Sequence, residues 1–271
     1  MHSIRPSAVA GVFYPGESQI LAEDLRSMLN AANLRSNVSP VVPKAIVVPH
    51  AGYIYSGSTA ALAYAHLAAH RSVIRRVVLL GPAHRVAVRG LALPGVDVFA
   101  TPLGDIAVDQ EAIQSISHLP QLVVSAAVHA QEHSLEVQLP FLQVVLDDFK
   151  LVPLVVGDAT PAEVAQVLDA LWGGPETLLV ISSDLSHYLS YQTATALDQT
   201  TVQHILNLDG SLTHHQACGA TPVNGLLLAA RKHPLQAQLL GLCNSGDSVG
   251  DKDRVVGYAS IAFTEEPRHA A

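Results

Sequence analysis

The sequence contains only two cysteines, Cys218 and Cys243. Two cysteines are too few for a disulfide framework, and the chain lacks the paired Cys-x-x-Cys spacing that holds a structural zinc ion. We therefore expect both to be free thiols. The sequence is thus unlike small disulfide-stabilised proteins and zinc-finger proteins.

Basic residues are also scarce. The 271 residues include 15 Lys and Arg against 23 Asp and Glu, and the basic residues form no run. Because a nucleic-acid-binding protein concentrates positive charge to neutralise phosphates, we expect no nucleic acid partner. No stretch reaches the roughly 18 uninterrupted apolar residues of a membrane span, and the first residues lack the apolar centre of a secretion signal. The sequence therefore predicts a soluble, cytoplasmic protein without membrane association.

Several common motifs are absent as well. The chain has no P-loop, no GxGxxG and no GxSxG, so nucleotide binding and serine hydrolase chemistry have no support in the sequence. Histidine, by contrast, is plentiful, with 14 residues. Since imidazole is the commonest metal ligand among side chains, the positions of these histidines in the fold become the main question.

Short apolar runs alternate with longer segments of helical spacing. The expected strands are Lys44–Val48, Arg76–Leu80, Lys150–Val156 and Thr177–Ile181. The expected helices are Ser58–Ala69, Glu132–Leu146, Pro161–Leu171, Tyr191–Leu206 and Pro222–Arg231. Near-continuous apolar strands that alternate with helices indicate a mainly parallel sheet covered on both faces. The pattern predicts an α/β three-layer sandwich.

The last part of the chain has a different pattern. Two strand-like runs, QLLGLC and RVVGYASIAF, flank the polar turn NSGDSVGDKD, which predicts a C-terminal antiparallel edge pair. The length and the 49% hydrophobic content allow one sizeable core. We expect a single domain over residues 1–271.

Polar residues follow directly after the apolar runs, where ligands bind in open α/β sheets. His50 and His84 follow the first two expected strands, Asp184 and His187 follow the fourth, and Asp247 follows QLLGLC. A single histidine at a strand end is more often structural than functional, so the inference depends on several coinciding. Histidines combined with a carboxylate suit borderline divalent metals. The sequence predicts a mononuclear metal site with His50 and His84 as its best ligand candidates.

The segment EHSLE, from Glu132 to Glu136, has two interpretations. It is typical of a capped helix start, where the helix dipole favours acidic residues in the first turn. Alternatively, His133 faces the site and moves protons or holds an anionic group of a substrate. The sequence alone leaves both open.

An ordered set of segments resembles a known family: IRPSAVAGVFYPG, VPHAGYIYSG, GPAH, EHSLEVQLPFL, SSDLSHY, CGATPVNGLL, NSGD and VVGYAS. These segments are similar to those of the Memo family, whose bacterial and archaeal members are called AmmeMemoRadiSam system protein B. The resemblance covers nearly the whole chain. The family fold is similar to that of the class III extradiol ring-cleaving dioxygenases, which are non-haem iron enzymes that use histidines and a carboxylate.

The resemblance implies roles for particular residues. His50 and His84 match the metal-ligand positions, and Asp184, His133 and His187 are the implied catalytic residues of the same pocket. The animal member is understood to use a further cysteine ligand near its C-terminus. Counted from the shared Gly-Tyr-Ala strand, that position falls near Ser248 in this chain. The third ligand is therefore expected in this turn, with Asp247 preferred as an anionic oxygen donor and Cys243 as the alternative.

Two functions are consistent with this resemblance. The first is a redox enzyme that holds Fe(II), with Cu or Zn as alternatives, and acts on a small molecule. The second is a non-catalytic protein that binds phosphopeptides or other anions in the same pocket, where Arg85 would meet the anion. The family name further implies radical-SAM and AMMECR-type partner proteins.

Overall fold

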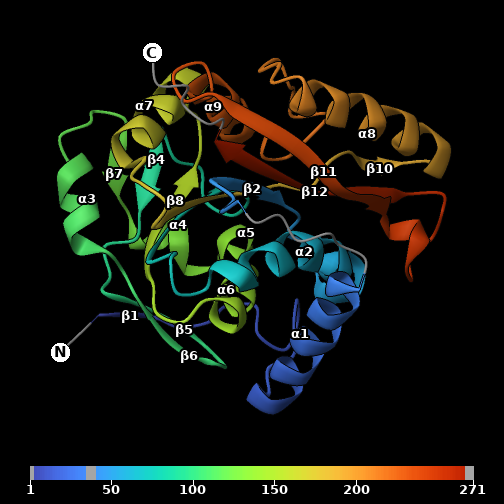
Figure 1. Ribbon diagram of the computed structural model, residues 1–271, viewed down its shortest axis with the longest axis horizontal. Coiled ribbons are helices and arrows are strands. Elements are labelled where there is room, and N and C mark those ends of the chain that lie inside the picture. The colour runs from blue at the N-terminus through green and yellow to red at the C-terminus, as the bar shows by residue number, and fades with distance from the viewer. Residues whose placement is uncertain (1–2, 35–40, 266–271) are drawn as a thin grey trace.

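The computed structural model describes residues 3–34 and 41–265. It shows an α/β fold whose nine-stranded mixed sheet runs through the molecule with helices on both faces (Figure 1). The strand order is β10-β12-β2-β9-β3-β8-β4-β7, and β11 pairs with β12 outside this path. A separate three-stranded sheet contains β1 (Ile4–Arg5), β5 (Val98–Thr101) and β6 (Gly104–Ala107).

The four expected strands form the parallel centre of the large sheet. They are β2 (Ala45–Val48), β3 (Arg76–Pro82), β8 (Lys150–Val156) and β9 (Thr177–Ser182). Their pairs β2–β9, β9–β3 and β3–β8 are all parallel. The prediction of a mainly parallel α/β sheet is confirmed.

Shorter strands extend the sheet on both sides. On one side β4 (Leu91–Leu93) pairs antiparallel with β8, and β7 (Leu122–Val124) pairs parallel with β4. On the other side β12 (Val255–Glu265) pairs antiparallel with β2, β10 (His187–Leu189) and β11 (Leu235–Asn244). The long β11–β12 ladder is the expected C-terminal antiparallel pair.

Two apolar clusters form the core, one on each face of the sheet. Alternate residues of a strand point to opposite faces, so Ile46 joins one cluster and Val47 the other. Helices α1 (Ser18–Asn33), α2 (Tyr53–Leu67) and α6 (Leu139–Val145) contribute to the first cluster. Helices α3 (Gln110–Ile116), α7 (Pro161–Leu171), α8 (Tyr191–Leu206) and α9 (Ala220–Ala229) contribute to the second.

The helices differ most from expectation at two places. Helix α2 begins at Tyr53, five residues before the expected start, directly after Gly52. The expected helix Glu132–Leu146 is two helices, α5 (His133–Glu136) and α6. Pro140 near the start of α6 has no N–H to donate to the carbonyl of Glu136, so one continuous helix would lose a hydrogen bond there. The break lets α5 and α6 point in different directions.

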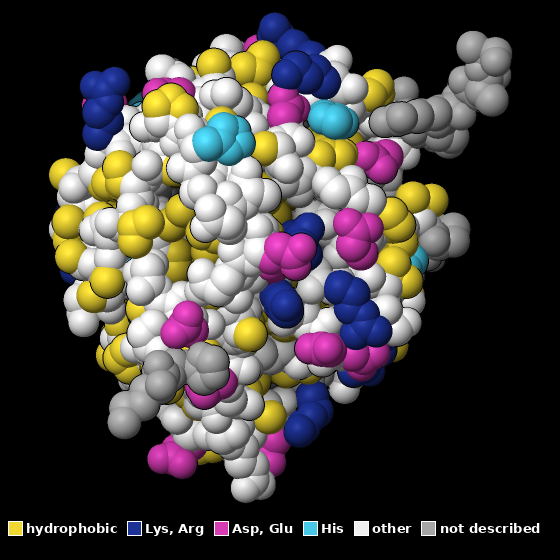
Figure 2. Space-filling model, turned by 90° about the vertical axis from the view of Figure 1, so that its left-hand side faces the viewer, with side chains coloured by type: hydrophobic (Ala, Val, Ile, Leu, Met, Phe, Trp, Pro, Cys, Tyr) yellow, Lys and Arg dark blue, Asp and Glu magenta, His cyan; other side chains and the backbone are white. Residues whose placement is uncertain are grey.

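Short helices complete the described chain: α4 (Ala126–Ala130) and the 3-10 turns η1 (Ala68–His70) and η2 (Ser245–Asp247). Within residues 3–34 and 41–265, no helix is long and apolar enough to cross a membrane. On the face drawn in Figure 2, Lys and Arg side chains lie beside acidic ones rather than in one basic patch. This face therefore offers no concentration of positive charge.

The parallel strands determine where the candidate site lies. Since β2, β3 and β9 run in one direction, the segments that follow them emerge at the same edge of the sheet. His50 comes two residues after β2, His84 two residues after β3, and Asp184 two residues after β9.

Candidate metal centre

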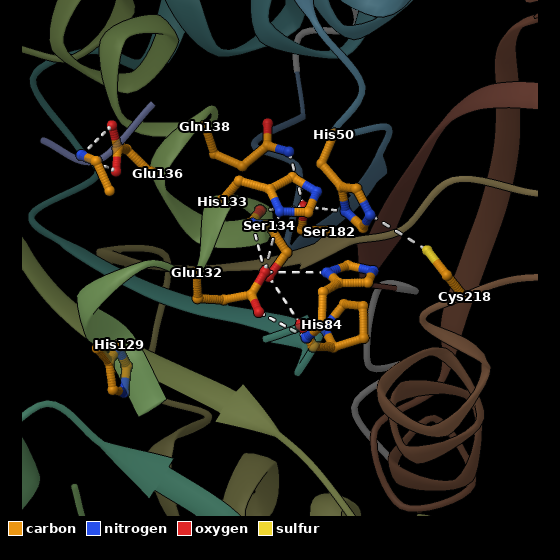
Figure 3. A network of polar contacts seen from close by, with 12 residues as sticks. His50, His84, His129, Glu132, His133, Ser134, Glu136, Gln138, Ser182 and Cys218 are labelled. Atoms are coloured by element: carbon orange, nitrogen blue, oxygen red, sulfur yellow. Dashed lines mark hydrogen bonds and ion pairs between the residues drawn. The ribbon is translucent and has the colours of Figure 1, made fainter. Parts of the chain in front are cut away.

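Three histidines come together at this edge of the sheet (Figure 3). One ring nitrogen from each of His50, His84 and His133 lies within 4.8 Å of the others. The ring centroids are 5.1 Å apart for His50 and His84, 5.5 Å for His50 and His133, and 4.6 Å for His84 and His133. His50 is 2% exposed, whereas the side chains of His133 and His84 are 14% and 28% exposed. The cluster thus extends from the interior to the surface.

The tautomer of His50 follows from its hydrogen bonds. The Ser182 hydroxyl donates to the carbonyl oxygen of Ser134 at 2.6 Å, which uses its only hydrogen. The contact of 3.0 Å between His50 Nδ1 and Ser182 Oγ must therefore have the imidazole as donor. His50 carries its proton on Nδ1, and Nε2 keeps a free lone pair.

Gln138 fixes the same network from the other side. Its Nε2 donates to Ser182 Oγ at 2.8 Å and to the carbonyl oxygen of Pro49 at 2.9 Å. Its Oε1 accepts from the Tyr64 hydroxyl at 2.9 Å. Because the Pro49 carbonyl can only accept, the orientation of the Gln138 amide is determined. Every member of this network is buried, so the orientation of His50 is strongly constrained.

Glu132 fixes the second histidine. Its Oε1 lies 2.9 Å from His84 Nδ1, and its Oε2 accepts from the His84 backbone N–H at 2.6 Å. Oε1 also accepts from the backbone N–H of Ser134 at 2.9 Å. Burial alone would raise the pKa of Glu132, but these hydrogen bonds lower it to about 2, so the group is a carboxylate. His84 then donates from Nδ1 and leaves Nε2 free, an arrangement common among metal-binding histidines.

His133 supplies a third imidazole with an unpaired nitrogen. Its Nδ1 is buried without a hydrogen-bond partner and lies 3.4 Å from Glu132 Oε1. Burial, together with the neighbouring His84, lowers the pKa of His133 to about 4, and burial lowers the pKa of His50 well below its usual value. Both rings are therefore neutral at pH 7, as metal ligands must be. Fixed tautomers and a buried unpaired nitrogen fit a metal ion.

Cys218, which was expected only to be a free thiol, lies beside the histidines. Its Sγ is 3.2 Å from His50 Nε2 and accepts a hydrogen bond from the Asp184 backbone N–H at 3.3 Å. Nitrogen and sulfur ligands at about 2.0 and 2.3 Å from a tetrahedral ion are roughly 3.5 Å apart, close to the observed separation. Burial, followed by the charge of Asp184, raises the pKa of Cys218 to about 12, so the metal-free protein carries a thiol.

A donor other than those expected for the third ligand lies beside the histidines. Cys243 contacts Thr59 Oγ1 at 2.9 Å and lines a separate groove together with Asp247 and Ser248. Neither Cys243 nor Ser248 is therefore the position beside the histidines, and Cys218 is. The signal that could have found it is its place directly before Gly219 and helix α9, within the segment CGATPVNGLL. Both cysteines are free thiols, as expected.

Asp247 has its own partners away from the histidines. Its Oδ2 accepts from the Asn244 backbone N–H at 2.9 Å, and its Oδ1 accepts from the Tyr191 hydroxyl at 2.6 Å. These bonds close the short turn η2. Among the described residues, neither Asp247 nor Cys218 belongs to the group of donors within 4.8 Å of one another, but Cys218 contacts His50 Nε2.

The remaining expected site residues lie around the cluster. Asp184 Oδ1 accepts from the His50 backbone N–H at 2.7 Å, and burial raises the pKa of Asp184 to about 7 although backbone hydrogen bonds oppose this. His187 and His84 line a cleft of about 450 Å³ that also reaches Cys218. Arg85 is exposed, and its charge contributes to the low pKa of His133. The cleft therefore gives access to the histidines from solvent.

The fold and site define an α/β protein with a cluster of three histidines, able to hold a metal ion, at the carboxyl ends of its parallel strands. The chain belongs to the Memo family, because the model of the Memo-like protein family matches residues 5–262. A MEMO1 family protein of Ignicoccus hospitalis is 36% identical over 285 residues, covering 96% of this chain and 98% of that protein. One from Aquifex aeolicus is 34% identical over 273 residues, covering 96% and 99%.

A solved structure supports the fold. The crystal structure of an uncharacterized protein from Escherichia coli K12 aligns with a TM-score of 0.50 and 15% sequence identity. The alignment covers 80% of this chain and 98% of that one. At this level of identity the likeness concerns the fold alone.

Proposed function

We propose that this protein is a metal-dependent redox enzyme that binds Fe(II) through the Nε2 atoms of His50 and His84. The observation that carries the proposal is the pair of fixed tautomers. Ser182 holds the Nδ1 proton of His50 and Glu132 holds that of His84, so both Nε2 lone pairs are available for one ion. Cu and Zn(II) are alternatives, because imidazole and thiolate ligands suit all three metals.

Cys218 is the third ligand in this proposal. Its sulfur lies at ligand separation from His50 Nε2. His133, one of whose ring nitrogens lies within 4.8 Å of those of His50 and His84, stands beside the ion and serves as a neutral base in this proposal. When bound, Fe(II) would supply Lewis-acid and one-electron redox chemistry. A thiol must lose its proton to bind a metal, so metal uptake through Cys218 releases one proton.

In this proposal the protein's own residues bind the substrate and accept protons from it. The cleft of about 450 Å³ lined by His84 and His187 has the size of a site for a small molecule. Burial lowers the pKa values of His133 and His187, so both are neutral at pH 7 and can accept a proton from a substrate hydroxyl. Asp184 orients the His50 backbone, and burial raises its pKa to about 7. A small phenolic substrate such as a catechol fits these groups.

A metal titration tests whether His50 and His84 bind Fe(II). Protein prepared without a chelator or a histidine tag is titrated anaerobically with Fe(II), and bound metal is counted by elemental analysis. The double variant His50→Ala, His84→Ala should lose more than about 100-fold in affinity. Cys218→Ser should also bind more weakly, whereas the control His204→Ala, on the exposed face of α8, should bind like the wild type.

Oxygen consumption tests the reaction. Iron-loaded protein is mixed with a set of catechols in an oxygen electrode, and the double variant is the blank. Consumption that depends on both the catechol and the histidines supports the enzyme. If the wild type binds Fe(II) no better than the double variant and consumes no oxygen, the proposal is wrong.

A second candidate function is binding of an anion without catalysis. The observation in its favour is that Arg85 is exposed, directly follows His84 and contributes to the low pKa of His133, so a cation lies near the histidines. Calorimetry with a phosphopeptide should then show binding that Arg85→Ala weakens about tenfold. Binding that is absent, or unaffected by Arg85→Ala, rejects this alternative.

The expected radical-SAM and AMMECR-type partner proteins stay a prediction. Co-purification of a tagged chain from its native cells, followed by mass spectrometry, is the measurement that checks it. If a variant with a changed exposed residue no longer co-purifies with the partner, that residue lies in the contact surface.

A further inference from the structure

The short strand β10, which begins with His187, is irregular at its middle residue. In the antiparallel ladder with β12, His187 lies opposite Val256. Leu189, two residues further along β10, lies opposite Val255, which is only one residue away from Val256. Tyr188 is therefore an extra residue without a partner, which is a β-bulge. Bulges are frequent next to active sites, where they change the direction in which a side chain points.

Tyr188 also has a backbone conformation that is unfavourable for tyrosine. Its φ is 59°, in the left-handed region, where the Cβ atom comes too close to the following carbonyl oxygen. Among the described residues, Leu208 is the only other non-glycine with a positive φ. The Tyr188 side chain is 65% exposed, so burial in the core does not compensate for the strain. Backbone strain of this kind clusters at functional sites, where surrounding contacts maintain it.

Buried hydrogen bonds fix the backbone just before His187. The carbonyl oxygen of Ser186 accepts from the Gly257 N–H at 2.9 Å, and the Ser186 N–H donates to Asp198 Oδ1 at 3.0 Å. Asp198 is 2% exposed and belongs to α8, which lies beside β10 (Figure 1). A Cβ atom on Gly257 would lie 1.9 Å from Asp198 Oδ2, so this position requires glycine. The freedom of His187 therefore depends on the residue that follows it.

The ring of Tyr188 has a contact that can hold the bulge. Arg254 Cζ lies 5.2 Å from the centroid of this ring, within the range of a cation–π interaction. Arg254 directly precedes β12, the strand with which β10 pairs. The rings of Tyr188 and His187 are 5.8 Å apart in an edge-on arrangement. Tyr188 thus connects the start of β12 to His187.

We propose that Tyr188 is a positioning residue, whose left-handed bulge and contact with Arg254 hold the imidazole of His187 in the cleft beside His84. The inference rests on the proposed function, in which His187 accepts a proton from the substrate. Both histidines line the cleft of about 450 Å³. If β10 paired without the extra residue, the register would shift by one on one side of Tyr188, and those side chains would turn to the other face of the sheet.

Nuclear magnetic resonance tests the position of His187 without any turnover. The ring signals of His187 in the metal-free full chain are identified by their absence from His187→Ala. Tyr188→Gly frees the backbone and removes the ring, so these signals should shift and broaden. Tyr188→Phe keeps a ring for Arg254 and should give the wild-type signals. The matched control Leu208→Gly relieves the same strain at a residue that does not line the cleft, and should leave the signals unchanged.

Kinetics test the consequence for the proposed reaction. In iron-loaded protein, Tyr188→Gly should lower kcat for a catechol about tenfold, because a displaced base contributes less to proton transfer. The KM and the amount of bound iron should not change, and Leu208→Gly should keep the wild-type kcat. A wild type that consumes no oxygen with any catechol contradicts the proposed function, and the ring signals then decide the position of His187 alone.

Two results overturn the inference. One is a Tyr188→Gly variant with the ring signals of the wild type, and the other is an active Tyr188→Gly variant with the kcat of the wild type. Should Tyr188→Gly not fold, Arg254→Gln removes only the cation–π contact and should shift the same His187 signals. Unchanged signals in folded Arg254→Gln then overturn the inference.

Discussion

Glu132 and Glu136 stand at the two ends of the single turn α5, yet they connect it to different parts of the molecule (Figure 3). Glu132 holds His84, whose other nitrogen stays free for a metal. Glu136 is fully buried and forms an ion pair with Arg5, and it also accepts hydrogen bonds from the backbone N–H groups of Ala8 and Val9.

The difference lies in what the partners can still do. Tyr14 donates to Glu136 at 2.7 Å, and Arg5 donates further to the carbonyl oxygens of His129 and Glu132, so this network is closed and attaches the N-terminal segment to α5. The network around Glu132 is open, because it ends at ring nitrogens without partners. Two similar buried carboxylates therefore have different roles. Glu136 stabilises the fold, whereas Glu132 orients the imidazole of His84.

The largest effect that sharpens this comparison is on folding. Glu136→Gln leaves the buried Arg5 guanidinium without its counter-charge, and breaking such a pair costs about 3 kcal/mol or more in the free energy of unfolding. Urea denaturation followed by circular dichroism measures it. Arg71→Ala, which removes an exposed pair with Asp147, is the control and should cost less than about 1 kcal/mol. Equal losses in the two variants would contradict a structural role for Glu136.

The next effect is on metal binding. Glu132→Gln weakens the acceptor that holds the Nδ1 proton of His84, and loss of such a partner lowers metal affinity by about 10 to 100-fold. Titration with Fe(II) measures this loss. Folded Glu136→Gln protein should bind the metal with the affinity of the wild type. Should Glu136→Gln impair binding as much as Glu132→Gln does, the two networks are not separate.

The sequence predicted the parts of the site that depend on strand direction. Apolar runs marked β2, β3 and β9, and because these strands are parallel, the residues that follow them had to meet at one edge. This places His50, His84 and Asp184 from pattern alone. The same reasoning gave the α/β class and the C-terminal antiparallel pair.

The parts that were not predicted depend on contacts between distant loops. Cys218 meets His50 across 168 residues of sequence, and no periodicity relates a residue before α9 to one after β2. The partners of His50, Ser182 and Gln138, were missed for the same reason, since a serine and a glutamine in apolar surroundings look like ordinary helix and strand residues. The two interpretations of the segment EHSLE are compatible in the structure. Glu132 caps helix α5, and His133 in the same segment faces the histidine cluster.

The pH dependence of stability tests the network around Glu136 separately from the network around Glu132. His129 lies on the Arg5 side, where its Nε2 donates to the Ala92 carbonyl oxygen, and burial lowers its pKa to about 4. Between pH 6.5 and about 4 the unfolded chain holds a proton on His129 that the folded chain lacks. The free energy of unfolding therefore falls as the pH falls through this window, by up to about 1.4 kcal/mol per pH unit for this group.

His129→Gln keeps a donor for Ala92 but cannot titrate. Its stability should depend on pH less steeply than that of the wild type between pH 6.5 and 4, as measured by urea denaturation at several pH values. Added metal should leave this difference in place, because His129 is not one of the clustered histidines. An identical slope in variant and wild type would show that His129 is not held neutral in the fold.

The smallest expected effect concerns the hydroxyl that orients His50. Ser182→Ala removes the acceptor of the Nδ1 proton, but the ring stays packed against His84 and His133. We expect metal affinity to fall about tenfold, the lower end of the range for such partners. Ser260→Ala is a matched control, because that buried hydroxyl donates to the Thr59 carbonyl oxygen and contacts neither a clustered histidine nor Cys218. If Ser260→Ala weakens metal binding as much as Ser182→Ala does, the loss comes from a general loosening of the core and not from the tautomer of His50.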